Sequence, residues 1–268
     1  MDHSRLFWPT PYPEINTVLE ALRAGVEAVL GQHFIGLYLH GSLASGDFNL
    51  HRSDIDFLVV TAGELREELL PDLQAMHARL AGSGGKWAAK LEGSYIPRPA
   101  LRRYEPEQAW HPALRIDGSF GVDQHASDWV IQRHLIREFG LVISGPPPRS
   151  LIDPVPRDAL RRAARAILEE WWSPMLNDTT RLQSSEYQAY TILTMCRALY
   201  TIQQGRVLSK PNAARWAQQA LGEHWATWIE RALAWHPGVQ LDNLDETLQF
   251  IQYTLDQARQ LPVVTDGD

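Results

Sequence analysis

The sequence has 268 residues, enough for one large domain or two smaller ones, and its 44% hydrophobic and 21% charged residues are ordinary for a globular protein. Its formal net charge of −7 argues against a general nucleic-acid binder and is compatible with a cationic ligand. The single cysteine, Cys196, excludes an intramolecular disulfide, and no segment approaches the ~20 apolar residues that span a membrane. We therefore expect a cytoplasmic protein that binds neither nucleic acid nor membranes, and we expect it separately to be a monomer.

Helical and strand-like segments alternate in the first half of the chain. Apolar residues with a period of 3.6 predict helices over Glu14–Leu30 and Glu64–Leu80. Short apolar runs predict strands at Ile35–His40, Ile55–Val60, Trp87–Ile96 and Leu141–Ile143. Residues 97–112 are expected to be a proline-interrupted connection, residues 113–122 a hairpin or an irregular segment, and Asp123–Phe139 a helix.

The second half reads as helical throughout. A glycine followed by three prolines at residues 145–148 breaks the chain, and we place a domain boundary within residues 145–157. Five further helices are predicted at Asp158–Trp172, Ser185–Gly205, Pro211–Leu221, Glu223–Trp235 and Leu244–Leu261. In the second of these, Ser185 is the expected N-cap and Gly205 the expected C′ residue.

Two aspartates, Asp54 and Asp56, open the predicted strand at Ile55–Val60, after a Gly41-Ser42 turn and a polar loop. Side chains at i and i+2 of a strand share one face, so the carboxylates are expected roughly 6–7 Å apart. Two such charges repel each other by about 3 kcal/mol at an effective dielectric constant of about 20, and a cation such as Mg²⁺ would neutralise them. The turn could bind the phosphates of a nucleotide. A bare pair of aspartates is more often a solvated strand end, and the surrounding order of elements favours the metal site.

A third carboxylate, Glu92, lies in the strand predicted at Trp87–Ile96. This strand is expected to pair beside the strand that carries Asp54 and Asp56, which would place three carboxylates at one site. A glutamate on an edge strand is ordinarily solvated, and the neighbouring motif favours a place beside the two aspartates instead.

The helix predicted at Ser185–Gly205 places Arg197 within the apolar stripe of Leu193 and Tyr200. A buried arginine needs a partner. It could pair with a core carboxylate, extend to the edge of the bundle, or contact a triphosphate. Lys210 begins the next helical segment and is of the type that binds phosphate, although a lone surface lysine would carry no such meaning.

The order Gly41-Ser42, loop, Asp54-Ile55-Asp56 between two strands resembles the signature of the nucleotidyltransferase superfamily. Over roughly residues 15–260, the chain resembles the aminoglycoside adenylyltransferases that modify streptomycin and spectinomycin. The segments that carry this resemblance are "LEGSY", "LIDPV" and "LTMCRALYTIQQGRVLSKPNAARWA". The loop from Ser42 to Ser53 is longer than the family form, and the drug-facing region diverges.

The resemblance implies an α+β fold in two domains. Residues 1–150 would form a nucleotidyltransferase domain of mixed sheet and helices, and residues 151–268 a helical bundle that closes the active-site cleft. The implied roles are Mg²⁺ binding by Asp54 and Asp56, catalytic base for Glu92, nucleotide binding by Gly41, Ser42, Ser53, Arg197 and Lys210, and acceptor binding by Trp172, Asp178 and Glu186. Trp171 is an equal alternative to Trp172.

The resemblance also implies Mg-dependent transfer of AMP from ATP to a hydroxyl of a streptomycin- or spectinomycin-like aminoglycoside, with release of pyrophosphate. ATP and a cationic small molecule would then be the partners. Two alternatives stay open: the acceptor could be another small molecule or a protein, or the chain could bind a nucleotide as a regulator without turnover.

Overall fold

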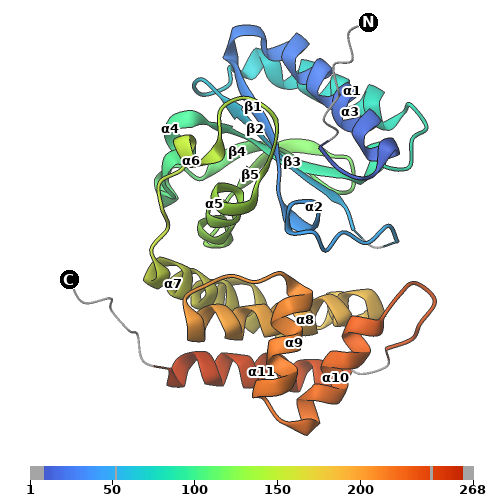
Figure 1. The fold of residues 1–268 in the computed structure, drawn as a ribbon, viewed down its shortest axis with the longest axis vertical. Helices are drawn as coiled ribbons and strands as arrows, with labels where there is room; N and C mark the ends of the chain where they lie inside the picture. The colour runs from blue at the N-terminus through green and yellow to red at the C-terminus, as the bar shows by residue number, and fades with distance from the viewer. Residues whose placement is uncertain (1–8, 52, 242–243, 262–268) are drawn as a thin grey trace, which may run out of the picture. The chain divides into compact units, whose positions relative to one another are not determined.

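A computed structural model of the chain describes residues 9–51, 53–241 and 244–261 (Figure 1). The described chain divides into two compact units. The first contains residues 9–49, 53–125 and 132–154, and the second contains residues 50–51, 126–131, 155–241 and 244–261. None of the described helices is long and apolar enough to cross a bilayer.

A six-stranded mixed sheet forms the centre of the first unit. Its strands are β1 (Phe34–Leu39), β2 (Ile55–Thr61), β3 (Leu91–Pro97), β4 (Trp110–Leu114), β5 (Phe120–Gln124) and β6 (Leu141–Ser144). Their order is β5-β4-β3-β2-β1-β6; β2 and β3 pair in parallel, and the other described pairs are antiparallel. The starts of β2 and β3 and the end of β1 therefore lie together at one edge of the sheet.

The two faces of the sheet differ in character. One face packs against α1 (Pro13–Leu30) and α3 (Leu70–Ala81), which lie side by side in Figure 1. Its core includes the fully buried side chains of Leu37, Phe57 and Tyr95. Because successive residues of a strand alternate between faces, the residues directly before and after each of these three in its strand point to the other face. That second face carries the polar residues of the candidate site.

Short helices complete the first unit. They are α2 (Gly41–Ser45), α4 (Arg98–Arg102) and α6 (Pro148–Leu151), and α5 (Asp128–Phe139) also ends in this unit. Arg133 of α5 donates to the carbonyl oxygens of Ala100 at 2.9 Å and Leu101 at 3.2 Å, which ties α5 to α4. Arg133 is buried, so these hydrogen bonds satisfy donors that water does not reach.

The second unit is helical. Its helices are α7 (Arg157–Ile167), α8 (Ser185–Gln204), α9 (Lys210–Ala220), α10 (Glu223–Ala234) and α11 (Leu244–Gln260), with a π-helical turn at Leu168–Trp172. The central helix is α8, which contacts each of the other four. Its N-cap is Ser184, one residue before the predicted cap, while Gly205 adopts the left-handed conformation expected of a C′ glycine.

Several predicted boundaries are wrong, each for a local reason. The strand predicted from Trp87 begins only at Leu91, because residues 88–90 form a 3₁₀ turn. The helix predicted from Glu64 begins at Leu70, because Pro71 lacks an N–H and fits only the first helical turn. The helix predicted at Asp158–Trp172 is confirmed as a helical segment that starts one residue earlier, but Leu168–Trp172 is π-helical instead of α-helical.

The region after β3 departs most from the prediction. Residues 113–122 belong to a hairpin, as one of the two predicted options, but its strand β4 starts at Trp110, inside the predicted connection. The helix predicted from Asp123 is also wrong at its start, because β5 continues to Gln124 and α5 begins at Asp128.

Candidate active site

A glycine turn closes one side of the candidate site. The strand β1 leads through His40 into α2, whose first residue, Gly41, has a φ of +60°. A Cβ atom at Gly41 would lie 1.8 Å from Oδ2 of Asp56, and the backbone N–H of His40 donates to the Asp56 carbonyl oxygen at 3.0 Å. The turn is therefore in direct contact with Asp56, and only glycine permits both the conformation and the approach.

The aspartates stand at the start of β2. Asp54 precedes the strand and Asp56 is its second residue, and both are half-buried. Ser53 closes the loop before them: its hydroxyl accepts from the Asn49 N–H at 3.0 Å, and its N–H donates to the Asn49 carbonyl oxygen at 2.9 Å. The hydrogen bonds of Ser53 thus help to fix the position of Asp54, just before the strand begins.

The third carboxylate lies on the neighbouring strand. The parallel register of β2 and β3 places Glu92 directly opposite Asp56, so the predicted proximity of Glu92 and Asp56 is confirmed. Burial, together with the negative charges of Asp56, Asp54 and Asp123, raises the pKa of Glu92 from 4.5 to about 7. A carboxylate with such a pKa is well matched to accepting a proton near neutral pH.

Two buried polar atoms near the turn have no hydrogen-bond partner among the described residues. They are the Ser42 hydroxyl oxygen and Oδ2 of Asp47, and the Asp47 N–H donates to the Ser42 carbonyl oxygen at 3.1 Å. An unsatisfied buried polar group costs free energy unless a ligand, ion or water completes it. The loop that follows Gly41 therefore has unused capacity to bind a polar ligand.

Sequence reasoning missed a cluster of polar side chains on the same face of the sheet. Ser94 lies two residues after Glu92, and its hydroxyl oxygen is 3.0 Å from Nε2 of His125. The rings of His125 and His111 have centroids 4.8 Å apart. Burial lowers the pKa of His111 to about 4 and that of His125 to about 2, so both are neutral at pH 7.

Asp123 of β5 was also missed. It pairs with Arg115, whose Nε donates to Oδ1 of Asp123 at 3.1 Å. Asp123 is opposite His111 in the β4–β5 register, and its charge contributes to the raised pKa of Glu92. No local signal marks this residue, because the segment that contains it was predicted to be a helix.

No group of three or more His, Cys, Asp or Glu side chains within the described ranges is arranged to hold a metal ion by itself.

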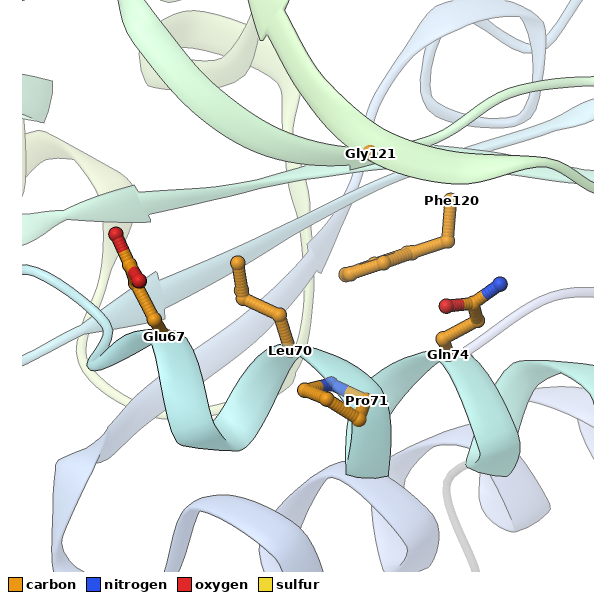
Figure 2. Close-up of a pocket in the computed structure, with 6 residues that line it drawn as sticks. All are labelled: Glu67, Leu70, Pro71, Gln74, Phe120 and Gly121. Carbon is orange, nitrogen blue, oxygen red and sulfur yellow. The ribbon is translucent and has the colours of Figure 1, made fainter.

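A pocket between α3 and β5 is lined by Glu67, Leu70, Pro71, Gln74, Phe120 and Gly121, and Figure 2 shows Phe120 reaching over the helix. Leu114 of β4 pairs with both Gly93 of β3 and Phe120 of β5, so these three residues lie on one face of the sheet. Glu92 precedes Gly93 in β3 and therefore points to the opposite face. The pocket is therefore separate from the site of Asp54, Asp56 and Glu92.

The remaining nucleotide-binding candidates belong to the second unit. Arg197 is half-buried on α8, and Lys210 is the first residue of α9. The ammonium nitrogen of Lys210 lies 3.8 Å from the centroid of the Tyr190 ring. The roles of both residues stay predictions.

The three acceptor-binding candidates have different surroundings. Trp172 is only 2% exposed, whereas its neighbour Trp171 is 46% exposed, so Trp171 is the tryptophan whose ring is accessible. Asp178 accepts from the N–H of Thr180 at 3.1 Å and from its hydroxyl at 2.6 Å, which lowers the pKa of Asp178. Glu186 is exposed in the first turn of α8.

Two family models match the chain. The model described as "Nucleotidyltransferase domain" matches residues 26–102, and "Aminoglycoside adenylyltransferase, C-terminal domain" matches residues 150–260. An aminoglycoside (3'') (9) adenylyltransferase of Escherichia coli is 27% identical over 254 residues, 90% of this chain and 93% of the relative. A spectinomycin 9-adenylyltransferase of Staphylococcus aureus is 26% identical over 228 residues, 81% of this chain and 83% of the relative.

A solved structure shares the fold. It is a spectinomycin adenyltransferase from Enterococcus faecialis with ATP and spectinomycin, with a TM-score of 0.72 and 18% sequence identity, covering 91% of this chain and 99% of that one. The α+β architecture predicted from the sequence, a nucleotidyltransferase domain followed by a helical region, is confirmed. This chain is an enzyme of the nucleotidyltransferase type, and it is similar to the aminoglycoside adenylyltransferases in both halves.

Proposed function

We propose that this enzyme transfers AMP from ATP to a hydroxyl group of an aminoglycoside-type antibiotic and releases pyrophosphate. The observation that carries the proposal is the placement of Glu92 directly opposite Asp56, with Asp54 two residues before Asp56, just ahead of strand β2. Two carboxylates for a metal and a third for a proton are what this chemistry requires. The names of the relatives support the acceptor class.

The carboxylates fit Mg²⁺. Asp54 and Asp56 would hold it, because Mg²⁺ prefers hard oxygen ligands and is usually bound by one or two carboxylates together with substrate phosphates. Besides burial, the negative charges of Asp56 and Asp54 contribute to the raised pKa of Glu92, and such a cation would offset this charge. When bound, Mg²⁺ would neutralise charge on the phosphate oxygens.

Each protein group then has a defined part in the reaction. Glu92 accepts the proton of the acceptor hydroxyl, whose oxygen forms a bond to the α-phosphorus of ATP while the bond to the pyrophosphate oxygen breaks. The Gly41–Ser42 turn and Ser53 bind the nucleotide phosphates, and the unused Ser42 hydroxyl is suited to this. Arg197 and Lys210 balance the charge of the triphosphate.

The acceptor is expected to be cationic, and its contacts are expected at Trp171, Asp178 and Glu186. Asp178 accepts two hydrogen bonds from Thr180, and its carboxylate remains exposed. Because its ring is buried, Trp172 would support the acceptor site without contacting the acceptor directly.

The test is pyrophosphate release. The purified enzyme with Mg-ATP and streptomycin or spectinomycin should turn over, and Glu92→Gln should lose about 10²–10⁴-fold in kcat because no base takes the proton. Turnover that does not exceed the Glu92→Gln control with any aminoglycoside would contradict the proposed acceptor class.

A second acceptor class has one observation in its favour. Cations already lie on two exposed aromatic rings of the second unit: the Arg181 guanidinium carbon is 4.9 Å from the Trp171 ring centroid, and the Lys210 ammonium lies on Tyr190. A non-cationic small molecule or a protein side chain would meet less repulsion there than a polycation. Incubation of cell extract with labelled ATP tests this, since a labelled product other than an aminoglycoside would support it.

A further inference from the structure

Lys210 is held in an unusual place for a lysine. The chain has twenty-two arginines and three lysines, Lys86, Lys90 and Lys210. Lys210 is the first residue of α9, directly after the N-cap Ser209, whose hydroxyl accepts from the Asn212 N–H at 3.4 Å. A helix N-terminus carries partial positive charge, so a cation there is disfavoured unless another group offsets the repulsion.

The Tyr190 ring supplies that offset. The Lys210 ammonium nitrogen lies 3.8 Å from the centroid of this ring, well within the range of a cation–π interaction. Tyr190 is itself supported, because its ring centroid is 6.1 Å from that of Trp172 and 5.5 Å from that of Tyr187. Trp172 is buried, so the arrangement has a fixed base in the helical core and an outer ring that carries the ammonium.

Such an arrangement reduces the conformational freedom of the lysine. A free lysine side chain loses much rotamer entropy when an anion fixes it. An ammonium already held on a ring has lost part of that freedom. Binding of an anion then costs less.

We propose that Tyr190 is a positioning residue that holds the Lys210 ammonium ready for the triphosphate of ATP, and that Trp172 fixes the Tyr190 ring from beneath. This inference rests on the proposed role of Lys210 in nucleotide binding. It gives Trp172 a function that its burial allows, in place of direct contact with the acceptor.

Lysine-selective isotope labelling tests the geometry without any substrate. With three lysines, the spectrum has three side-chain sets of signals. The ε-CH₂ signals of Lys210 should lie upfield because of the Tyr190 ring current, and Tyr190→Leu should return them to ordinary positions. The signals of Lys86, whose nitrogen is 4.7 Å from the Trp87 ring centroid, should not move in this variant and serve as the internal control.

ATP binding tests the role. Tyr190→Leu should raise the KM for ATP and its calorimetric Kd by roughly threefold to tenfold, with kcat within about twofold, and Tyr190→Phe should restore both. Lys210→Met should weaken ATP binding at least as much, and adding Tyr190→Leu to Lys210→Met should have no further effect. Lys86→Met is the matched control, because it removes a lysine from a different cation–π pair, the one with Trp87.

The outcomes separate the two proposals. An unchanged Kd for ATP in Tyr190→Leu, beside a weakened Lys210→Met, would overturn the positioning role and leave the phosphate contact intact. Unshifted Lys210 signals in the wild type would overturn it as well. An unchanged Kd in Lys210→Met would remove both the phosphate contact and its positioning. Calorimetry with ATP alone gives these results even if no aminoglycoside is modified.

Discussion

Gly41 fixes the geometry of the site through the side chain that it lacks. Its φ is +60°, and a Cβ would lie 1.8 Å from Oδ2 of Asp56. We expect Gly41→Ala to destabilise the fold by at least about 1–2 kcal/mol, the cost of a left-handed conformation, and to displace Asp56. Urea unfolding should show the loss of stability, and pyrophosphate release should fall steeply.

Gly46 provides the matched control for this prediction. It ends α2 with a φ of +77°, but no atom lies within 4 Å of a Cβ placed there. Gly46→Ala should therefore show the backbone cost and keep most of the activity. Equal losses of activity in the two variants would show that contact with Asp56 is not what matters at Gly41.

The raised pKa of Glu92 implies a trade between stability and function. The folded state binds this proton more tightly than the unfolded state, so the stability that the protonated carboxyl provides is complete below pH 4.5 and is lost as the pH rises to about 7. At pH 8 the buried charge costs about 3 kcal/mol at most. In EDTA, Glu92→Gln should thus be about 1–3 kcal/mol more stable than the wild type at pH 8, although it lacks the base.

Urea unfolding at two pH values checks the Glu92 prediction. The gain in stability should disappear at pH 4, where the wild-type carboxyl is neutral. Glu68→Gln, at an exposed position of the same unit, should show little difference at either pH. A gain that is the same at pH 4 and pH 8 would rule out charge as its cause.

At the scale of the elements, α8 organises the second unit, and its N-cap is the place to test this. The Ser184 hydroxyl accepts from the N–H of Tyr187 at 3.1 Å, and the helix packs against α7, α9, α10 and α11. Ser184→Ala should lower the stability by about 1 kcal/mol, whereas Ser184→Asp keeps an acceptor and places a negative charge at the N-terminus. The urea midpoint should fall for alanine and hold for aspartate; equal midpoints would contradict the cap.

The elements also show what the sequence can and cannot predict. Gly41, Asp54, Asp56 and Glu92 were predictable, because a local motif and one pair of neighbouring strands bring them together. Asp123 and His125 were not, because pairing across β3, β4 and β5 brings them to the site. A strand is recognised in a sequence by its regular alternation of apolar residues. Polar residues on the face that carries the candidate site interrupt this alternation in β5, and the prediction therefore places Asp123 in a helix.

At the scale of the whole molecule, buried histidines are concentrated in the first unit. Four histidines of the first unit are buried: His40, His77, His111 and His125. In the second unit, His224 and His236 are exposed. Burial lowers the pKa of His77 from 6.5 to about 4. The two units should therefore respond differently to acid, and hydrogen exchange measured on peptides from each unit can separate their responses.

We expect the first unit to lose stability as the pH falls from about 6.5 to about 4. In this window the unfolded chain takes up protons on its histidines while the folded unit does not, so unfolding becomes more favourable by up to about 3 kcal/mol for His77 alone. His77→Gln should reduce this slope, because glutamine can still bond the Tyr95 hydroxyl, which lies 2.7 Å from Nε2 of His77, but cannot titrate. His236→Gln, at an exposed site, should leave the slope unchanged. If peptides of the second unit lose their protection first, or if His77→Gln and His236→Gln behave alike, the buried histidines are not the source of the acid sensitivity.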